Sequence, residues 1–367
     1  KFGDAINSKK LISYQYDTAR RIQFKDVGMN GVITRYIYDI HDQMTESTSP
    51  FFSQQLFYHN GTGTPCYNGN ISSMTWKSES DANMRGYRFK YDGLNRLVHA
   101  EYGEKDDMSL NRGRYDEGIT SYDKNGNIRG LQRFGQTDTN AYGQVDGLSL
   151  SYTGNRLLCV TDSATKNTYG SGFDFKKGAE LATEYFYDTN GNLTKDLNKK
   201  ITDIQYNCLN LPQTIEFVDG STVSYLYRAD GRKLQVTHKN ENSVNVTDYC
   251  GNAVYENGSL KKILTEGEGY ISLSGSTPVY NYYLKDHMGN IRIVYDQNRE
   301  VKDVNHYYPF GGLIASSANS NQPYKYNGKE LDRKNGLDWY DYGARHYDAT
   351  LGRWHVMDSS SEKNYSN

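Results

Sequence analysis

The chain has 367 residues, of which 42 are basic and 44 acidic, and its formal net charge is −2. The sequence therefore has no excess of positive charge that would indicate binding to nucleic acid or to an anionic membrane. No apolar run approaches the ~20 residues of a membrane-spanning helix. Tyrosine occurs 34 times and glycine 35 times, although hydrophobic residues make up only 36% of the chain. Because tyrosine favours strands and disordered chains are poor in aromatic residues, the composition indicates a large, mostly β protein.

The cysteines lie far apart and form no CxxC pair; they are Cys66, Cys159, Cys208 and Cys250. A zinc site needs four ligands, usually in close pairs. We therefore expect isolated buried thiols, no disulfide scaffold, and neither a metal ion nor a cofactor. Residue 1 is lysine and no signal segment follows it, so the chain is expected to begin at a fragment boundary or a processing point.

The first part of the chain contains weak repeats. The stretch YDTARRIQF starts at Tyr16, and STSPFF and the segment Asn60–Asn70 are interpreted as loops or insertions. Short apolar stretches such as Phe51–Tyr58 lack the length and the caps of a helix. Residues 1–90 are therefore expected to form degenerate repeats with loop insertions.

From residue 91 to residue 280 the repeats are plain. Copies of the pattern Tyr-Asp-x-x-Gly-(Asn/Arg)-x-Leu/Ile begin at Tyr91, Tyr122, Tyr152, Tyr187, Tyr206, Tyr227 and Tyr249. The spacing is 31 and 30 residues from the first to the third copy, and 19, 21 and 22 residues from the fourth to the seventh. A pattern that recurs in this way indicates one supersecondary unit per repeat, here a hairpin of about 20 residues.

Each position of the repeat has a physical role. The tyrosine ends a strand, the aspartate accepts hydrogen bonds from backbone N–H groups of the turn, and Asn-Gly or Asp-Gly supplies the positive φ angles of a tight hairpin. For example, Val223, Tyr225 and Tyr227 alternate on one face before a turn, and Val236 follows after it. Because one hairpin cannot bury its face alone, neighbouring hairpins are expected to pair edge to edge.

This pattern resembles the YD-repeat, or RHS-repeat, family. Its most specific motifs lie in residues 281–358 and resemble the RHS-associated core in the form seen among Bacteroidetes proteins. They are YYLKDHMGNIRIVYD (Tyr282–Asp296), YYPFGG (Tyr307–Gly312), YKYNGKELD (Tyr324–Asp332) and GLDWYDYGARHYDATLGRW (Gly336–Trp354). We expect structural roles for the core residues Tyr340, Asp341, Gly343, Arg345, Tyr347, Asp348, Gly352, Arg353 and Trp354. Residues 359–367 are then the truncated start of a segment that follows the core.

The resemblance implies an all-β fold in which YD-repeat hairpins form an extended, curved, spiral β-sheet, as part of a hollow RHS-type shell. In that family the shell commonly encloses a C-terminal effector, often a toxin, and relatives include polymorphic-toxin shells and the teneurins of animals. We therefore expect a bacterial protein, secreted or at the cell surface, that carries an effector absent from these residues. Expected partners are that effector segment, immunity or delivery proteins, or a second copy that pairs through open sheet edges.

Asp358 is the only catalytic candidate in the chain. Many members of the family cut their own chain near the core with an aspartyl-type site, in which two close carboxylates share a proton. Asp358 resembles the first aspartate of such a pair, but Ser359 stands where the family usually has proline, and no second aspartate follows. We therefore do not expect enzymatic activity from this chain, and Asp358 is retained as half of an autoproteolytic pair in a longer parent.

Other titratable groups near the end of the chain are interpreted structurally. His346 and His355 suggest general base chemistry, but no Gly-x-Ser-x-Gly stretch marks a nucleophile, so both are expected to lie in the sheet in polar pairs. Asp286 and His287 are adjacent, and adjacent strand residues point to opposite faces. A turn is therefore expected there rather than a metal pair.

A cell-surface adhesin or glycan-binding repeat protein is the alternative hypothesis, because rows of aromatic rings also form platforms for sugars. It predicts that Trp76, Trp339 and Trp354 line an open groove beside carboxylates or amides. The container hypothesis predicts instead a polar inner face with room for cargo.

Overall fold

The computed structural model describes residues 12–28, 31–170, 172–273, 277–314 and 322–358. Over these residues the chain is all-β, and its antiparallel strands lie beside one another in chain order in sheets of 12, 13 and 4 strands. This arrangement confirms the expected all-β fold of hairpins that pair edge to edge. No helix among the described residues is long and apolar enough to cross a bilayer.

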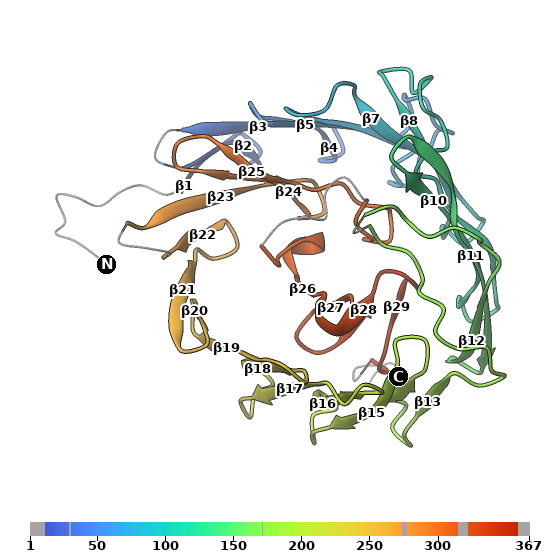
Figure 1. Cartoon of the computed structure of the whole chain (residues 1–367). Helices are drawn as coiled ribbons and strands as arrows, with labels where there is room; N and C mark the ends of the chain where they lie inside the picture. Colours follow the sequence, from blue (N-terminus) through green and yellow to red (C-terminus); the bar gives the residue numbers. More distant parts are fainter. Residues whose placement is uncertain (1–11, 29–30, 171, 274–276, 315–321, 359–367) are drawn as a thin grey trace, which may run out of the picture. The chain divides into compact units, whose positions relative to one another are not determined.

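The chain divides into two compact units, each built from two separate stretches (Figure 1). The first unit combines Lys1–Asp116 with Leu264–His306, and the second combines Glu117–Ile263 with Tyr307–Asn367. The two compact units do not coincide with the four successive segments suggested by the sequence. Those segments still describe where the sequence motifs lie. The last segment, 359–367, lies outside the described residues.

The strands of the first unit are β1 (Ile12–Tyr16), β2 (Ile22–Val27), β3 (Val32–Tyr38), β4 (Met44–Thr48), β5 (Phe52–Phe57), β6 (Ser73–Ser78), β7 (Arg85–Tyr91), β8 (Leu97–Glu104), β22 (Gly269–Ser272), β23 (Val279–Lys285), β24 (Ile291–Asp296) and β25 (Val301–Val304).

The strands of the second unit are β9 (Glu117–Tyr122), β10 (Ile128–Asp138), β11 (Ala141–Thr153), β12 (Arg156–Asp162), β13 (Tyr185–Tyr187), β14 (Leu193–Asp196), β15 (Ile201–Tyr206), β16 (Pro212–Phe217), β17 (Thr222–Tyr227), β18 (Lys233–Lys239), β19 (Val244–Cys250), β20 (Ala253–Glu256), β21 (Ser259–Leu264, whose last residue belongs to the first unit), β26 (Glu330–Asp332), β27 (Trp339–Asp341), β28 (His346–Asp348) and β29 (Arg353–Trp354). Short 3-10 turns cover Tyr326–Gly328 and Lys334–Gly336. We call residues 117–263, strands and turns together, the wall, and strands β26–β29 the core sheet.

The repeat turns share one hydrogen-bonding scheme. In the turn between β9 and β10, Asp123 Oδ1 accepts the backbone N–H groups of Asn125 (2.9 Å) and Asn127 (2.8 Å). The same pair of bonds, to the second and fourth following residues, recurs at Asp17, Asp39, Asp92, Asn207, Asp286 and Asp296. The predicted role of the aspartate is therefore confirmed, and Asp286 is a turn residue as expected.

Each of these turns has one residue with a positive φ angle, three positions after the aspartate. It is glycine in some turns, as at Gly126 (φ 86°), and asparagine, arginine or aspartate in others, as at Asn95 (61°), Arg20 (65°) and Asp42 (62°). The strand register shifts by one residue at the preceding tyrosine, for example at Tyr91 and Tyr227. The turn is therefore a short loop closed by a bulge, in which a single left-handed residue suffices and glycine is not obligatory.

The tyrosine of the repeat joins each hairpin to the one before it. The Tyr152 hydroxyl donates to the Ile128 carbonyl (2.8 Å) and the Tyr206 hydroxyl to the Leu193 carbonyl (2.6 Å). Equivalent bonds run from Tyr38 to Ile22, from Tyr58 to Met44 and from Tyr91 to Ile71. The ring covers the apolar face while the hydroxyl satisfies a backbone acceptor, which explains why the chain uses tyrosine rather than phenylalanine.

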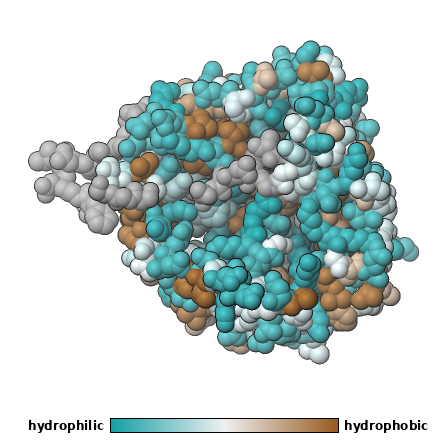
Figure 2. Space-filling view, in the orientation of Figure 1, coloured by the Kyte–Doolittle hydropathy of each residue, from teal (hydrophilic) through white to brown (hydrophobic). Residues whose placement is uncertain are grey.

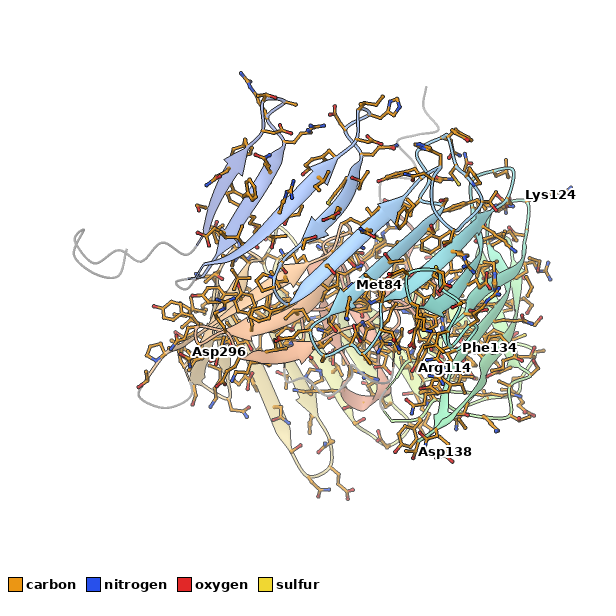
Figure 3. The ribbon with its side chains drawn as sticks, turned by 90° about the horizontal axis from the view of Figure 1, so that it is seen from above. Met84, Arg114, Lys124, Phe134, Asp138 and Asp296 are labelled. Atoms are coloured by element: carbon orange, nitrogen blue, oxygen red, sulfur yellow. The ribbon has the colours of Figure 1, made fainter. Side chains whose placement is uncertain are left out.

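Strand length and surface character vary along the chain. The longest strands, β10 and β11, have 11 and 13 residues, and Figure 3 labels Lys124, in the turn before β10, and Asp138, the last residue of β10. On the face seen in Figure 2, hydrophilic residues predominate and hydrophobic residues form small separate groups. The cysteines are free, but Cys208 and Cys250 are exposed, so the expectation of buried thiols is wrong for these two.

Candidate functional site: the core sheet and its anchors

The core sheet is built from two of the four motifs that resemble the RHS-associated core, YKYNGKELD and GLDWYDYGARHYDATLGRW. Its strands pair in order, so that Leu331, Tyr340, Tyr347 and Trp354 lie side by side across it. The YYPFGG and YKYNGKELD motifs lie in the same unit, whereas YYLKDHMGNIRIVYD forms β23 and β24 of the first unit. The motifs are therefore pieces of two compact units rather than of one.

One face of the core sheet packs against the wall (Figure 1). Trp339 is 1% exposed and shares an apolar cluster with residues of β15–β18: Ile204, Ile215, Val223, Tyr225 and Val236. Alternation along β17 and β18 places these wall side chains on one face, as predicted. The wall is therefore apolar where the core sheet covers it, and the polar face expected of a container is wrong for this stretch.

The opposite face of the core sheet packs against the YYPFGG motif. The Tyr340 hydroxyl donates to the Gly311 carbonyl (3.0 Å) and the Tyr347 hydroxyl to the Phe310 carbonyl (2.9 Å). Gly311 has a φ of +93°, and a Cβ atom there would lie 2.6 Å from the Tyr326 ring. Only glycine fits at this position, which explains its place in the motif.

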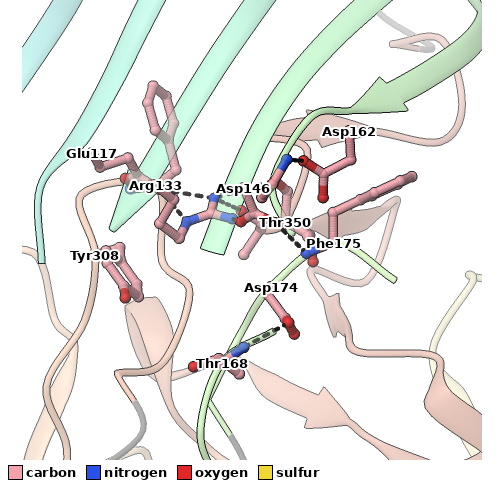
Figure 4. A network of polar contacts seen from close by, with 12 residues as sticks. Glu117, Arg133, Asp146, Asp162, Thr168, Asp174, Phe175, Tyr308 and Thr350 are labelled. Carbon is pink, nitrogen blue, oxygen red and sulfur yellow. Dashed lines mark hydrogen bonds and ion pairs between the residues drawn. The ribbon is translucent and has the colours of Figure 1, made fainter. Parts of the chain in front are cut away.

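Arg133 ties the wall to the loop between β28 and β29 (Figure 4). Its guanidinium binds Glu117 (Nε to Oε1, 2.9 Å) and Asp146, and donates to the Thr350 carbonyl (3.2 Å). The side chains of Arg133, Glu117 and Asp146 are fully buried. The other carboxylate oxygens accept backbone N–H groups, Glu117 that of Phe310 and Asp146 that of Phe175.

The charges of this network depend on one another. Burial raises the pKa of Asp146 to about 6 and raises that of Glu117, although Arg133 acts against both shifts. Burial alone lowers the pKa of Arg133, but the two carboxylates outweigh it and the net shift is upward. The arginine is therefore the fixed charge on which the ionisation of both acids depends.

A second buried ion pair joins the wall to β28. Lys199, in the turn between β14 and β15, lies with its Nζ 3.2 Å from Asp348 Oδ2. Burial acts to raise the pKa of Asp348, but the ammonium group lowers it overall. Asp196 lies near the same lysine, and there burial prevails and raises the pKa to about 6.

A third cluster centres on Lys233 of β18. Its Nζ lies 2.6 Å from Asp341 Oδ2 and 2.9 Å from Glu330 Oε2, and both acids belong to the core sheet. His238 Nε2 lies 2.7 Å from Asp332 Oδ2 on the same edge. These groups line a pocket of about 390 Å³ whose other walls include tyrosine rings from the wall and from the segment before β26.

The remaining predicted core residues also have structural contacts. Arg353 donates to the Asn155 carbonyl (3.1 Å), and Trp354 packs on the rings of Tyr342 and Tyr347. Gly343 and Gly352 have φ angles of 85° and 65°, which L side chains rarely adopt.

Asp358 lies at the end of the described chain, where it forms an ion pair. Its Oδ2 lies 2.9 Å from Arg345 Nη2, and its side chain is 48% exposed. The Arg345 guanidinium also lies 4.4 Å from the centre of the Trp354 ring. Ser359, the next residue, lies outside the described part of the chain.

His346 and His355 lie among aromatic rings, which the sequence did not predict. His355 is 3.9 Å from Trp339 between ring centres, and His346 is 5.7 Å from Tyr225. Within the described residues no hydrogen-bond partner reaches His346 Nδ1 or His355 Nε2. Burial lowers the pKa of both, that of His355 to about 3, so both imidazoles are neutral near pH 7.

The three tryptophans do not form the groove predicted by the adhesin hypothesis. Trp76 and Trp339 are 0% and 1% exposed, and the indole of Trp76 donates to His306 Nδ1 (3.0 Å). Trp354 is half-buried against its neighbours in the core sheet. The prediction that the three tryptophans line an open groove is therefore wrong.

The wall residues that hold the core sheet were missed in the sequence. Arg133 offered a signal, since it lies two residues after Leu131 and so on the buried face of β10. A charge in such a position needs a buried partner. Among the described residues no group of three or more histidine, cysteine, aspartate or glutamate side chains is placed to hold a metal ion.

Comparisons with known proteins relate the chain to toxin complexes and to one insect protein. It matches the crystal structure of TcdB2–TccC3 with a TM-score of 0.54 and 16% identity, over 95% of this chain and 21% of that chain. It matches the Photorhabdus luminescens Tc holotoxin pore, in a form with a TccC3 mutation, with a TM-score of 0.54 and 16% identity, over 95% of this chain and 20% of that one. No protein-family model matches the chain.

Salivary gland surface protein 1 of Aedes aegypti is 28% identical over 249 residues, which is 60% of this chain and 7% of that protein. The chain thus spans a small part of the length of each of these relatives. The fold, an all-β succession of YD-repeat hairpins, is similar to a part of the fold found in the TcdB2–TccC3 structures.

Proposed function

We propose that the chain is part of a carrier wall that holds a C-terminal effector segment, as in polymorphic toxins with the Bacteroidetes form of the RHS core. The observation that supports it is the core sheet, which the wall contacts just before Asp358 through three cations largely shielded from water: Arg133, Lys199 and Lys233. A sheet anchored in this way fixes the point from which the following segment starts. The partners are that segment and its delivery or immunity proteins, and the protein acts outside the cell or at its surface.

Limited proteolysis of the natural protein, including the residues that follow Asn367, tests this proposal. The segment beyond the core should be digested at least tenfold more slowly than the same segment made alone, because the wall shields it. The Arg133→Met variant, which loosens the core sheet, should lose part of this protection. Equal digestion rates for the attached and isolated segments would contradict the carrier role.

Asp358 belongs to this proposal as half of an autoproteolytic pair in the longer protein. Its exposed carboxylate, held by Arg345, lies at the end of the core. Asp358→Asn should abolish cleavage of the longer chain, while Arg345→Lys, which keeps a cation beside the carboxylate, should retain it. A longer chain that is never cleaved would contradict this role for Asp358.

A cell-surface adhesin is the second candidate, and the name of the Aedes aegypti relative, a surface protein, is the observation that favours it. In this case the pocket beside Lys233, with Tyr225, Tyr249 and Tyr324 in its lining, would receive the sugar rather than a tryptophan groove. A glycan array in which no sugar binds the purified chain counts against this function.

A further inference from the structure

Lys233, Glu330 and Asp341 lie close enough together for chemistry beyond the ion pairs that join the wall to the core sheet. The lysine comes from β18 of the wall, the glutamate from β26 and the aspartate from β27. Lys233 Nζ lies 2.6 Å from Asp341 Oδ2 and 2.9 Å from Glu330 Oε2. The three side chains are 14%, 16% and 21% exposed for lysine, aspartate and glutamate. One amine is thus held between two carboxyl groups of another sheet, largely shielded from bulk water.

We propose that this is a self-modifying site, in which Lys233 Nζ condenses with the side-chain carboxyl group of Asp341 to form an isopeptide bond. The bond would join the wall covalently to the core sheet. It requires no cofactor and no effector segment, so the inference does not depend on the proposed carrier function.

The surrounding groups supply the roles that amide formation needs. Asp341 is the acyl partner because its carboxylate is the nearer one, and its Oδ1 accepts the Gly343 backbone N–H (2.7 Å). That donor stabilises the negative charge that develops on Oδ1 in the tetrahedral intermediate. Glu330 is the base and proton relay, and its Oε1 is held by the Tyr249 hydroxyl (2.6 Å).

The reaction balances without an external reagent. A proton passes from the Lys233 ammonium through Glu330 to Oδ2 of Asp341, and the neutral amine attacks Cγ of the carboxyl group, which is now neutral as well. The Nζ–Cγ bond forms, the Cγ–Oδ2 bond breaks, and Oδ2 leaves as water with two of the three protons that Nζ carried. Glu330 ends in its starting state, and the water enters the adjoining pocket of about 390 Å³, which all three residues line.

The charges of the site make this a slow, single event rather than a turnover reaction. Burial favours the neutral forms of both groups, but their mutual attraction outweighs it, raising the pKa of Lys233 and holding that of Asp341 well below its usual range. The ion pair is therefore the resting state, and fixed proximity in a shielded site drives its conversion.

Intact-mass spectrometry of the purified full chain tests the proposal. The folded wild-type protein should weigh less than its sequence by one water molecule, and a protease digest should contain one branched peptide linked through Lys233 and Asp341. Glu330→Gln and Lys233→Arg should both have the full sequence mass, and circular dichroism should show that they remain folded. Lys199→Arg, at the other wall lysine that faces the core sheet, is the matched control and should still lose one water.

The intact mass of the wild-type protein tests the proposal even if the variants fail to fold. A folded wild-type chain that keeps the full sequence mass after days of incubation would overturn the proposal. A branched peptide linked through Glu330 or through Lys199 would also overturn the assignment of Lys233 and Asp341.

Discussion

Three cations of the wall, all largely shielded from water, meet the core sheet or its loop in the second unit. Arg133 bonds the loop after β28, Lys199 faces Asp348, and Lys233 lies between Glu330 and Asp341. Burying a charge is costly unless it is paired and hydrogen-bonded. Removing one member of such a group therefore leaves uncompensated charge in the interior, whereas placing the core sheet correctly satisfies all of them together.

Arg133→Met should destabilise the second unit by about 3–5 kcal/mol, because it leaves Glu117 and Asp146 buried without their cation. Urea unfolding, followed by tyrosine and tryptophan fluorescence, measures the change. Arg228→Ala is the matched control, since Arg228 and Asp230 form an exposed pair (62% and 53%) and its loss should cost less than about 1 kcal/mol. Equal losses for the two variants would show that the Arg133 network does not anchor the fold.

At the scale of the element, each hairpin is a self-contained turn that needs its neighbour to complete the burial of its strands. The turn is closed within five residues by one aspartate and one residue of positive φ. The next hairpin is then fastened by a tyrosine hydroxyl and by strand pairing. This division explains why turns vary in sequence while the tyrosine recurs.

Tyr206→Phe should lower the free energy of unfolding of the second unit by about 0.5–1.5 kcal/mol, because the Leu193 carbonyl loses its donor while the ring stays in place. Thermal unfolding followed by circular dichroism measures this effect. The control is Tyr169→Phe, at a ring that is 46% exposed, where little change is expected. A Tyr206→Phe variant as stable as the wild type would mean that the hydroxyl does not fasten the hairpins.

At the scale of the whole molecule, both compact units are completed by segments distant in the chain. The first unit receives Leu264–His306, where His306 accepts a hydrogen bond from Trp76, 230 residues earlier. The second receives Tyr307 onward, where Arg133 bonds a carbonyl 217 residues away. Such distant contacts make folding slow compared with that of local structures.

The stability of the second unit should depend on pH through Asp196 and His355 in opposite directions. The pKa of Asp196 is raised from 3.8 to about 6 in the fold, so the folded state binds the proton more tightly and gains stability as pH falls between these values. The pKa of His355 is lowered from 6.5 to about 3, so the unfolded state binds the proton more tightly and stability falls as pH falls.

Replacing either residue should change how the free energy of unfolding depends on pH. Relative to the wild type, Asp196→Asn should lose up to about 3 kcal/mol of stability between about pH 7 and about pH 4, and His355→Gln should gain stability over the same range. Urea unfolding at several pH values measures both. Profiles parallel to that of the wild type would mean that neither group changes its proton affinity on folding.

Much of the fold could be predicted from the sequence, and less of the candidate site. The strands, the turn role of the aspartates, and the edge-to-edge pairing follow from residues that lie a few positions apart, as at Asp123 and Asn127. The aromatic surroundings of His346 and His355 could not be predicted, because both imidazoles lie in a cluster that forms only when β27 and β28 pack on the wall. The Asp358 hypothesis stays a prediction.

The sequence by itself determined the local structure of this protein, because a turn needs only an acceptor, a residue of positive φ and the next strand. Only the tertiary structure decided which buried charges meet. Lys233 and Asp341 are 108 residues apart, and His238 and Asp332 are 94 apart. No periodicity along the chain relates such pairs, since their contact depends on how a separate sheet packs against the wall.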